Sequence, residues 1–416
     1  MQNLALLAFS LLGNDSNVAP SPAELLVRRA LTAIESQPNR AEAYNQLAFA
    51  LSRRARETAD PAFYERAHEA IQVSLALEPG NLGARKQEAW ALLGQHRFGE
   101  AADLASALNQ EVPDDVLVYG FLVDAHVELG NYATAETACQ WMLDMRPGNV
   151  PALTRAAYLR EIYGDVDGAL DLLGEAFYGV PATESEDQAW ILTHMSHLHR
   201  SVGRYDVARG LVERALGLFP DYHYALAELA CIRLSEGDPR AAAVLLRRRY
   251  DAAPHPENLL DLARALRSAG DEEEARALFD QFEEAAMKES EGSDNANREL
   301  VGYLVDDVDG RESDALALAR REVERRHDVF TRDALAWAFH SNGRTEEARK
   351  EIESVLEVGL REARVLYHAG AILAASGEPA RARALLRESL VRDPRSEVAP
   401  GAIDLLAGLP GGDAAR

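Results

Sequence analysis

Ten alanines recur along this chain of 416 residues at nearly one fixed interval. They are Ala67, Ala101, Ala135, Ala169, Ala208, Ala242, Ala275, Ala315, Ala348 and Ala382. Most neighbours in this series are 33 or 34 residues apart, and two gaps widen to 39 and 40 residues. A period of this length is typical of a solenoid built from two-helix repeats. The interval therefore predicts one architecture for almost the whole chain.

Glycine and proline recur in step with the alanines. Eight alanines have a glycine five residues earlier, at Gly130, Gly164, Gly203, Gly237, Gly270, Gly310, Gly343 and Gly377. Seven have a proline twelve residues later, at Pro79, Pro113, Pro147, Pro181, Pro220, Pro254 and Pro394. Glycine adopts the left-handed conformation that ends a helix, and proline cannot continue one because it lacks an N–H. Each unit therefore reads as helix, glycine turn, helix, proline turn.

With alanine, glycine and proline agreeing in so many copies, residues 41 to 396 resemble the tetratricopeptide repeat family. The alanine falls where the two helices of a hairpin approach most closely, so a larger side chain would push them apart. The resemblance implies an all-α fold. We expect a right-handed superhelical α-solenoid of about ten tetratricopeptide-like helix hairpins.

The repeats also divide the chain. We expect two blocks of repeats, each flanked by segments that do not follow the pattern. The predicted parts are 1–22 as a disordered lead-in or signal remnant, 23–40 as an N-terminal capping helix, 41–287 as repeats, 288–298 as a polar break or hinge, 299–396 as repeats, and 397–416 as a C-terminal capping helix and tail.

Charge and hydropathy guide the prediction of partners and compartment. The chain has 44 basic and 68 acidic residues, a net charge of −24, which disfavours non-specific attraction to phosphates. We therefore expect no nucleic-acid partner, and we expect no membrane-spanning helix because no apolar stretch is long enough. Leu4 to Leu12 fits either the apolar core of a signal peptide or a plain lead-in. Cytoplasmic location is the default, and export to the periplasm is the alternative.

Catalytic motifs are missing from the sequence. It contains no phosphate-binding loop, no Gly-x-Ser-x-Gly elbow and no His-Glu-x-x-His pair. The repeats also leave no room for a separate catalytic domain. We therefore predict a non-enzymatic protein without a cofactor, whose function lies on the surface that the repeats form together.

In the family, the first helices line a concave groove, and positions two, five, six, nine and twelve of each repeat point into it. Carried onto this sequence residue by residue, that geometry yields a set of candidate peptide-binding residues. They are Phe49, Trp90, Phe121, Asp124, Arg155, Tyr158, Trp190, His194, His197, Tyr224, Glu228, Cys231, Asp261, Arg264, Trp337 and Tyr367.

These candidates fall into three zones. Phe49, Trp90 and Phe121 at the N-terminal end either project into the groove, where they suit the anchoring of apolar side chains, or pack across neighbouring first helices or under the insert at 53–63. A second apolar patch at the C-terminal end joins Val301, Leu304, Trp337 and Tyr367. The middle zone, from Arg155 to Arg264, is rich in hydrogen-bonding groups suited to a peptide backbone or charged side chains. Its alternative reading is a self-satisfied network in which Arg155, Arg264, Glu228 and Asp261 neutralise one another.

The favoured function is thus a scaffold that binds a protein or peptide in its concave groove. One alternative is a metal-binding or metal-delivery protein. His194 and His197 lie three residues apart, as do Glu228 and Cys231 on the next first helix, which is a spacing that suits a tetrahedral ion. Another alternative is a structural assembly factor that self-associates through its convex face or its ends.

Overall fold

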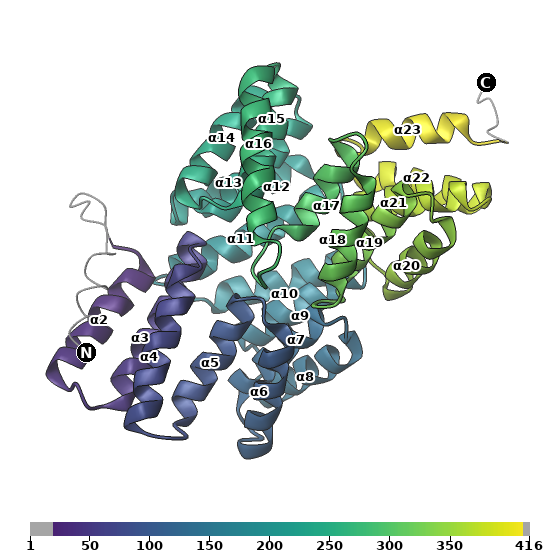
Figure 1. Ribbon diagram of the computed structural model, residues 1–416. Helices are drawn as coiled ribbons and strands as arrows, with labels where there is room; N and C mark the ends of the chain where they lie inside the picture. Colours follow the sequence, from purple (N-terminus) through teal and green to yellow (C-terminus); the bar gives the residue numbers. More distant parts are fainter. Residues whose placement is uncertain (1–19, 411–416) are drawn as a thin grey trace.

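The computed structural model describes residues 20–410, which form 22 α-helices and no strand (Figure 1). The helices are α2 (Pro22–Ser36), α3 (Ala41–Thr58), α4 (Ala62–Leu77), α5 (Leu82–Gly94), α6 (Phe98–Glu111), α7 (Val116–Glu128), α8 (Tyr132–Met145), α9 (Val150–Ile162), α10 (Val166–Gly179), α11 (Ser185–Arg200), α12 (Tyr205–Leu218), α13 (His223–Ser235), α14 (Pro239–Ala252), α15 (Pro256–Ala269), α16 (Glu272–Glu289), α17 (Asn297–Asp306), α18 (Glu312–Val323), α19 (Val329–Ser341), α20 (Thr345–Val358), α21 (Ala363–Ala375), α22 (Pro379–Arg392) and α23 (Ala399–Gly408).

Helices α3 to α22 pair as ten antiparallel hairpins, from α3 with α4 to α21 with α22. Each second helix also packs on the first helix of the next hairpin, so the hairpins stack into a superhelix. The predicted all-α solenoid of about ten hairpins is confirmed. Helix α2 packs on α3 before the first hairpin, and α23 packs on α22 after the last. Most of the predicted lead-in and the end of the predicted tail lie outside the described residues.

The repeated residues have the roles that their spacing predicts. All ten alanines are at most 1% exposed, because each lies where the two helices of its hairpin meet. The eight glycines have φ between 69° and 87°, the left-handed region that ends a first helix. In the first two hairpins, Ala59 and His96 adopt this conformation, with φ of 54° and 56°. The turn is therefore kept in hairpins that lack the glycine.

The superhelix closes on itself, which the repeat pattern does not predict. The turn between α7 and α8 in the third hairpin contacts the start of α19 in the ninth, where the His327 N–H donates to the Glu128 carbonyl at 3.0 Å. The Val329 N–H donates to the Tyr132 hydroxyl at 2.8 Å. Figure 1 shows the green helices α17 to α19 returning to the blue helices α7 to α10. Two superhelical turns are therefore in direct contact.

This contact continues along the edge of the first superhelical turn, and we call it the seam. It joins each of the first five hairpins to a part of the chain further along. Its side-chain and close backbone contacts pair Arg56 with Glu186, His96 with Asp294, Glu128 with Arg326, Gly164 with Gly359, and Tyr205 with Asp393. The fold is therefore a superhelix whose successive turns are joined.

Glycines at the seam and away from it provide a matched pair of substitutions. A Cβ at Gly130 would lie 2.5 Å from the His327 carbonyl oxygen, whereas a Cβ at Gly343 meets nothing within 4 Å. Their φ values, 71° and 69°, are nearly equal. We expect Gly343→Ala to lower the free energy of unfolding by about 1 to 2 kcal/mol through backbone strain. Gly130→Ala adds the overpacking cost of about 1 to 3 kcal/mol. Urea unfolding followed by circular dichroism measures both, and equal losses would contradict the seam.

The polar segment 288–298, predicted as a break or hinge, is held against α18. The Arg325 guanidinium donates to the carbonyl oxygens of Glu291 and Gly292 at 2.7 and 2.6 Å. The Asn297 side chain donates to Glu322 at 2.9 Å. A hinge motion at this segment would have to break these hydrogen bonds.

Candidate binding site on the inner face

We call the side chains at positions two, five, six, nine and twelve of the first helices the inner face. Its most distinctive feature is a set of aromatic residues that keep part of their surface in contact with water. They are Phe49, Trp90, Tyr158, Trp190, Tyr224, Trp337 and Tyr367. Seven of the ten hairpins contribute one such residue, so aromatic surface is available at both ends and in the middle of the superhelix, with a gap at α15 and α17.

Three apolar residues predicted to face a ligand are buried instead, and the predicted site residue Glu228, at 6% exposed, is buried as well. Phe121 is 2% exposed and packs against Ala89 and Val118, between neighbouring first helices. Val301 and Leu304 are likewise buried in the main core cluster. The prediction that these side chains project into the groove is wrong, because neighbouring first helices approach closely enough to cover them.

The N-terminal zone contains a pocket of about 540 Å³ between α2, α3, α5 and α7. Its lining includes Phe49 and Leu117, two apolar side chains that are substantially exposed. The ring of Phe49 lies 5.3 Å from that of Trp90, with the planes tilted by 58°. Gln46 and Lys86 place polar groups in the same pocket. The lining thus combines exposed apolar side chains with polar and charged ones, a mixture that suits the anchoring of an amphipathic ligand segment.

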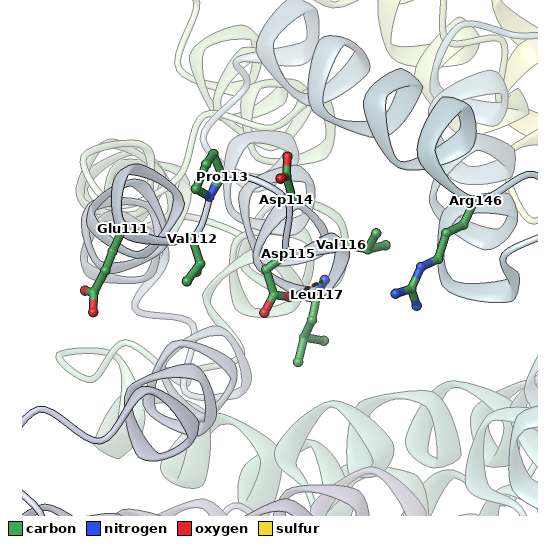
Figure 2. Close-up of a pocket in the computed structure, with 8 residues that line it drawn as sticks. All are labelled: Glu111, Val112, Pro113, Asp114, Asp115, Val116, Leu117 and Arg146. Atoms are coloured by element: carbon green, nitrogen blue, oxygen red, sulfur yellow. Dashed lines mark hydrogen bonds between the residues drawn. The ribbon is translucent and has the colours of Figure 1, made fainter.

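A second pocket, also of about 540 Å³, lies around the connection between α6 and α7 and was not part of the sequence prediction (Figure 2). Leu117 lines both pockets, so they adjoin. Arg146, the residue that follows α8, also lines this pocket (Figure 2). Two of its acidic groups are engaged, because Glu111 pairs with Arg85 at 2.5 Å and Asp115 pairs with Lys86 at 2.8 Å. Asp114 lines this pocket as well. The second pocket therefore extends the N-terminal zone and adds one acidic and one basic side chain to it.

The charged residues of the middle zone are paired within the chain. The closest N–O distances are 2.5 Å for Arg155 with Asp124, 2.8 Å for Arg200 with Glu228, 2.5 Å for Arg249 with Asp261, and 2.6 Å for Arg264 with Asp307. The charges of this zone are thus neutralised within the chain, as the network reading predicts. The pairs differ from the predicted ones, because Arg155, Arg264, Glu228 and Asp261 do not pair with one another. A ligand that used these charges would have to displace an existing partner.

Glu161, which the sequence prediction omitted, links two of the predicted residues. Its carboxylate lies 2.5 Å from His194 Nε2 and 3.1 Å from His197 Nε2. Burial acts to raise the pKa of Glu161, but the hydrogen bonds from both histidines outweigh it and hold the pKa far below the usual range. Burial acts to lower the pKa of His197, and the bond to Glu161 outweighs it, so that pKa is raised.

Glu161 occupies position twelve of its repeat, and this row is where the prediction was incomplete. The same position supplies further members of the inner-face networks. They are Arg200, Arg267, Asp307 and His340. The family geometry points position twelve into the groove, so the residues of this row carry the signal for these network members in the sequence itself.

The residues proposed to bind a metal are engaged in other contacts. His194 and His197 both bond to Glu161, while Glu228 pairs with Arg200. Burial raises the pKa of the Cys231 thiol, which disfavours the thiolate that a metal would need. Within residues 20–410, no three histidine, cysteine or acidic side chains are placed to hold an ion together. The structure therefore gives no support to the metal-binding alternative.

The C-terminal zone is an aromatic cluster. Trp337 stacks on His368 with the ring centroids 4.2 Å apart and donates its indole N–H to Asp306 at 2.9 Å. His368 in turn bonds to Asp333 at 2.9 Å. Tyr367 lies 5.8 Å from Trp337 and remains partly exposed. These contacts fix the orientation of Trp337 on the inner face.

The buried His223, which lies at the seam, gives a prediction for pH. Its Nε2 bonds to the Arg56 carbonyl at 3.2 Å, and burial lowers its pKa to about 4. Nearby Arg249 and His255 act in the same direction. In the unfolded chain the pKa of histidine is about 6.5, so the unfolded state takes up this proton first as the pH falls. Stability should therefore be lost between about pH 6.5 and pH 4, by up to about 3 kcal/mol.

The variant His223→Gln keeps a side-chain N–H donor and removes the titration. We expect its free energy of unfolding to fall less steeply than that of the wild type as the pH drops from 7 to about 4.5. His197 has a raised pKa and acts with the opposite sign, but it is present in both proteins and cancels in the difference. Urea unfolding across this pH range measures the two slopes, and identical slopes would contradict the assignment.

Comparison with known proteins agrees with this architecture. The model of the family described as Tetratricopeptide repeat matches residues 86–150 and 334–397. These regions cover hairpins in both superhelical turns, and the same helix hairpin recurs throughout residues 41 to 392. These two regions match the tetratricopeptide repeat model, and the solenoid fold that such repeats form generally mediates protein–protein interaction. No curated protein matches the sequence.

Solved structures share the fold at low sequence identity. The human IFIT1 dimer with PPP-AAAA is 13% identical, with 90% of this chain and 95% of that chain covered and a TM-score of 0.50. Cut9–Hcn1, the APC/C hetero-tetramer, is 15% identical over 97% of this chain and 62% of that chain, with a TM-score of 0.49. The pilus biogenesis factor PilW is 14% identical over 49% and 93%, with a TM-score of 0.39. At these identities the comparison concerns the fold alone.

The net charge of the chain does not decide whether it binds nucleic acid. Excluding a nucleic-acid partner on the basis of net charge is wrong, because IFIT1, a protein of similar fold, is solved with PPP-AAAA. The potential inside a solenoid depends on the residues that line it, and net charge does not determine it. As for membranes, none of the described helices combines the length and the apolar character that spanning a bilayer requires.

Proposed function

We propose that this protein is a non-enzymatic scaffold that binds an extended segment of a partner protein on its inner face. The observation that carries the proposal is the series of seven partly exposed aromatic residues on the first helices. Aromatic side chains are enriched among the residues that dominate binding energy in protein interfaces. Placed at intervals along a superhelix, they suit a ligand that contacts several repeats in turn.

The paired charges of the middle zone support the same function in another way. Arg155 donates to both carboxylate oxygens of Asp124 and to the carbonyl oxygens of Gly120 and Pro151, which hold its guanidinium in place. Glu161 likewise fixes His194 and His197 in place. Side chains held by such networks lose little conformational freedom when a ligand arrives, which lowers the cost of binding. The charges therefore act mainly to fix the surface, while the aromatic residues provide the contact area.

Affinity capture from the source cell tests the proposal. The bait proteins are the wild type, the inner-face variant Phe49→Ala/Tyr224→Ala, and the outer-face control Tyr178→Ala. Each bait is incubated with nuclease-treated lysate and, separately, with untreated lysate. Tyr178 is 90% exposed on the second helix α10, so it matches Tyr224 in type and differs in face. We expect a protein that is recovered by the wild type and the control and lost by the inner-face variant. Equal recovery by all three baits would overturn the proposal, as would a nucleic acid as the lost component.

A further inference from the structure

The seam encloses the inner face along its side. Contacts connect each of the first five hairpins to the chain further along, from Arg56 in the first to Tyr205 in the fifth. Between these ends, Gly130 and Gly164 approach the backbone of His327 and Gly359 so closely that a methyl group would not fit. A side-entry opening would need a gap between the superhelical turns, and these backbone contacts leave none at the third and fourth hairpins.

Charged and aromatic groups reinforce the seam at its other points. At the second hairpin, the Arg326 guanidinium lies 5.2 Å from the ring centroid of Phe98 and also pairs with Glu128. At the fifth, the Arg395 guanidinium lies 4.9 Å from the ring centroid of Tyr205. Cation–π contacts and ion pairs of this kind strengthen when they are shielded from water. The seam is therefore continuous from the first hairpin to the fifth.

Water nevertheless reaches residues on the enclosed side. Tyr224 is 47% exposed. Its pKa is raised, with burial as the largest cause, and Arg56, Arg249, Glu257 and Glu186 also act on it. Its ring lies 4.0 Å from that of His223, which bonds to the Arg56 carbonyl across the seam. Tyr224 is thus an inner-face residue beside the seam that keeps contact with water, in contrast to Tyr178 on the outer face.

From these observations we infer that the superhelix is a closed tube whose inner face is reached only from its two ends. The partner that fits it is an unfolded polypeptide segment with a free terminus, which enters along the axis. An internal loop flanked by folded domains does not fit, because it would have to cross the seam. The choice of partner rests on the proposed function, whereas the closure rests on the seam contacts alone.

Thiol labelling tests the closure without knowledge of the partner. One protein carries Tyr224→Cys and the other carries Tyr178→Cys, each combined with Cys231→Ser so that no second partly exposed thiol competes. Cys139 is buried in both. Three maleimides are compared: N-ethylmaleimide, a maleimide at the end of a linear polyethylene glycol, and a maleimide on the surface of lysozyme. Circular dichroism confirms that both variants are folded.

At position 178 we expect the three reagents to react at similar rates. At position 224 we expect the small and the linear reagents to react, and the lysozyme-borne reagent to be slowed by at least about 100-fold, since it must await a transient opening of the seam. Adding Arg56→Met and Arg326→Met to the Tyr224→Cys protein removes two seam contacts and should restore its reaction with the lysozyme-borne reagent. Equal rates of the lysozyme-borne reagent at the two positions would overturn the closed tube. That result would leave the proposed function intact, because an open groove also binds a segment.

Discussion

Replacing Arg56 by methionine should lower the free energy of unfolding by about 3 to 5 kcal/mol, the cost of leaving a buried charge without its partner. The Arg56 guanidinium bonds to both carboxylate oxygens of Glu186, at 3.0 and 2.9 Å. Glu186 is 1% exposed, and its one other partner among the described side chains is the Tyr222 hydroxyl at 2.8 Å. Burial already raises the pKa of Glu186, and the loss of Arg56 removes the main opposing influence.

Arg53 provides the matched control, because it also joins α3 to the region of α11. Its partners Glu184 and Asp187 keep about a third of their side-chain surface exposed, so water can replace the guanidinium. Arg53→Met should therefore cost at most about 1 kcal/mol. The double variant Arg56→Met/Glu186→Gln should recover most of the loss, since no charge is then left unpaired. Urea unfolding measures all three, and an Arg56→Met loss no larger than that of Arg53→Met would contradict the buried pair.

The second large effect concerns binding. We expect Phe49→Ala/Trp90→Ala to weaken the affinity for the captured partner by at least about 30-fold, since a truncated interface hot spot costs 2 kcal/mol or more. The two rings are in contact at 5.3 Å, so the single variants should not be additive. Phe49 is 37% exposed, and its loss should leave the fold intact.

Isothermal titration calorimetry with the captured partner measures these affinities, and Tyr178→Ala is the control. The control should bind with the affinity of the wild type, because its side chain lies on the outer face. If the double variant binds within about threefold of the wild type, the N-terminal pocket is not an anchoring site, since a change of that size is less than 1 kcal/mol.

Residue spacing predicted the helices, the hairpins and their number because these depend on neighbours. Packing within a hairpin and between adjacent hairpins is local, so the local signals of alanine, glycine and proline are sufficient for it. The seam depends on the small rotation between repeats, summed over several hairpins. No residue type at Gly130 or His327 signals that they meet, and the sequence pattern therefore could not reveal the contact.

The candidate site was predictable in part for a related reason. The family geometry indicates which positions turn inward, and it placed Tyr224 and Trp337 where aromatic surface is available. It does not indicate how closely neighbouring first helices approach, and for this reason Phe121 was wrongly expected to be exposed. It also does not indicate which charges pair, which depends on side-chain reach between repeats. Glu161 shows this, since its two partners lie on the next first helix.

The most direct test of the central claim is photo-crosslinking in the source cell, with benzoylphenylalanine placed at position 224 or at position 178. Both positions hold a tyrosine, so the substitution is conservative in each. If a partner segment lies on the inner face, irradiation should link the partner to position 224 and not to position 178, and mass spectrometry of the product should identify an extended segment. Crosslinking at position 178 alone, or equally at both positions, would contradict binding on the inner face.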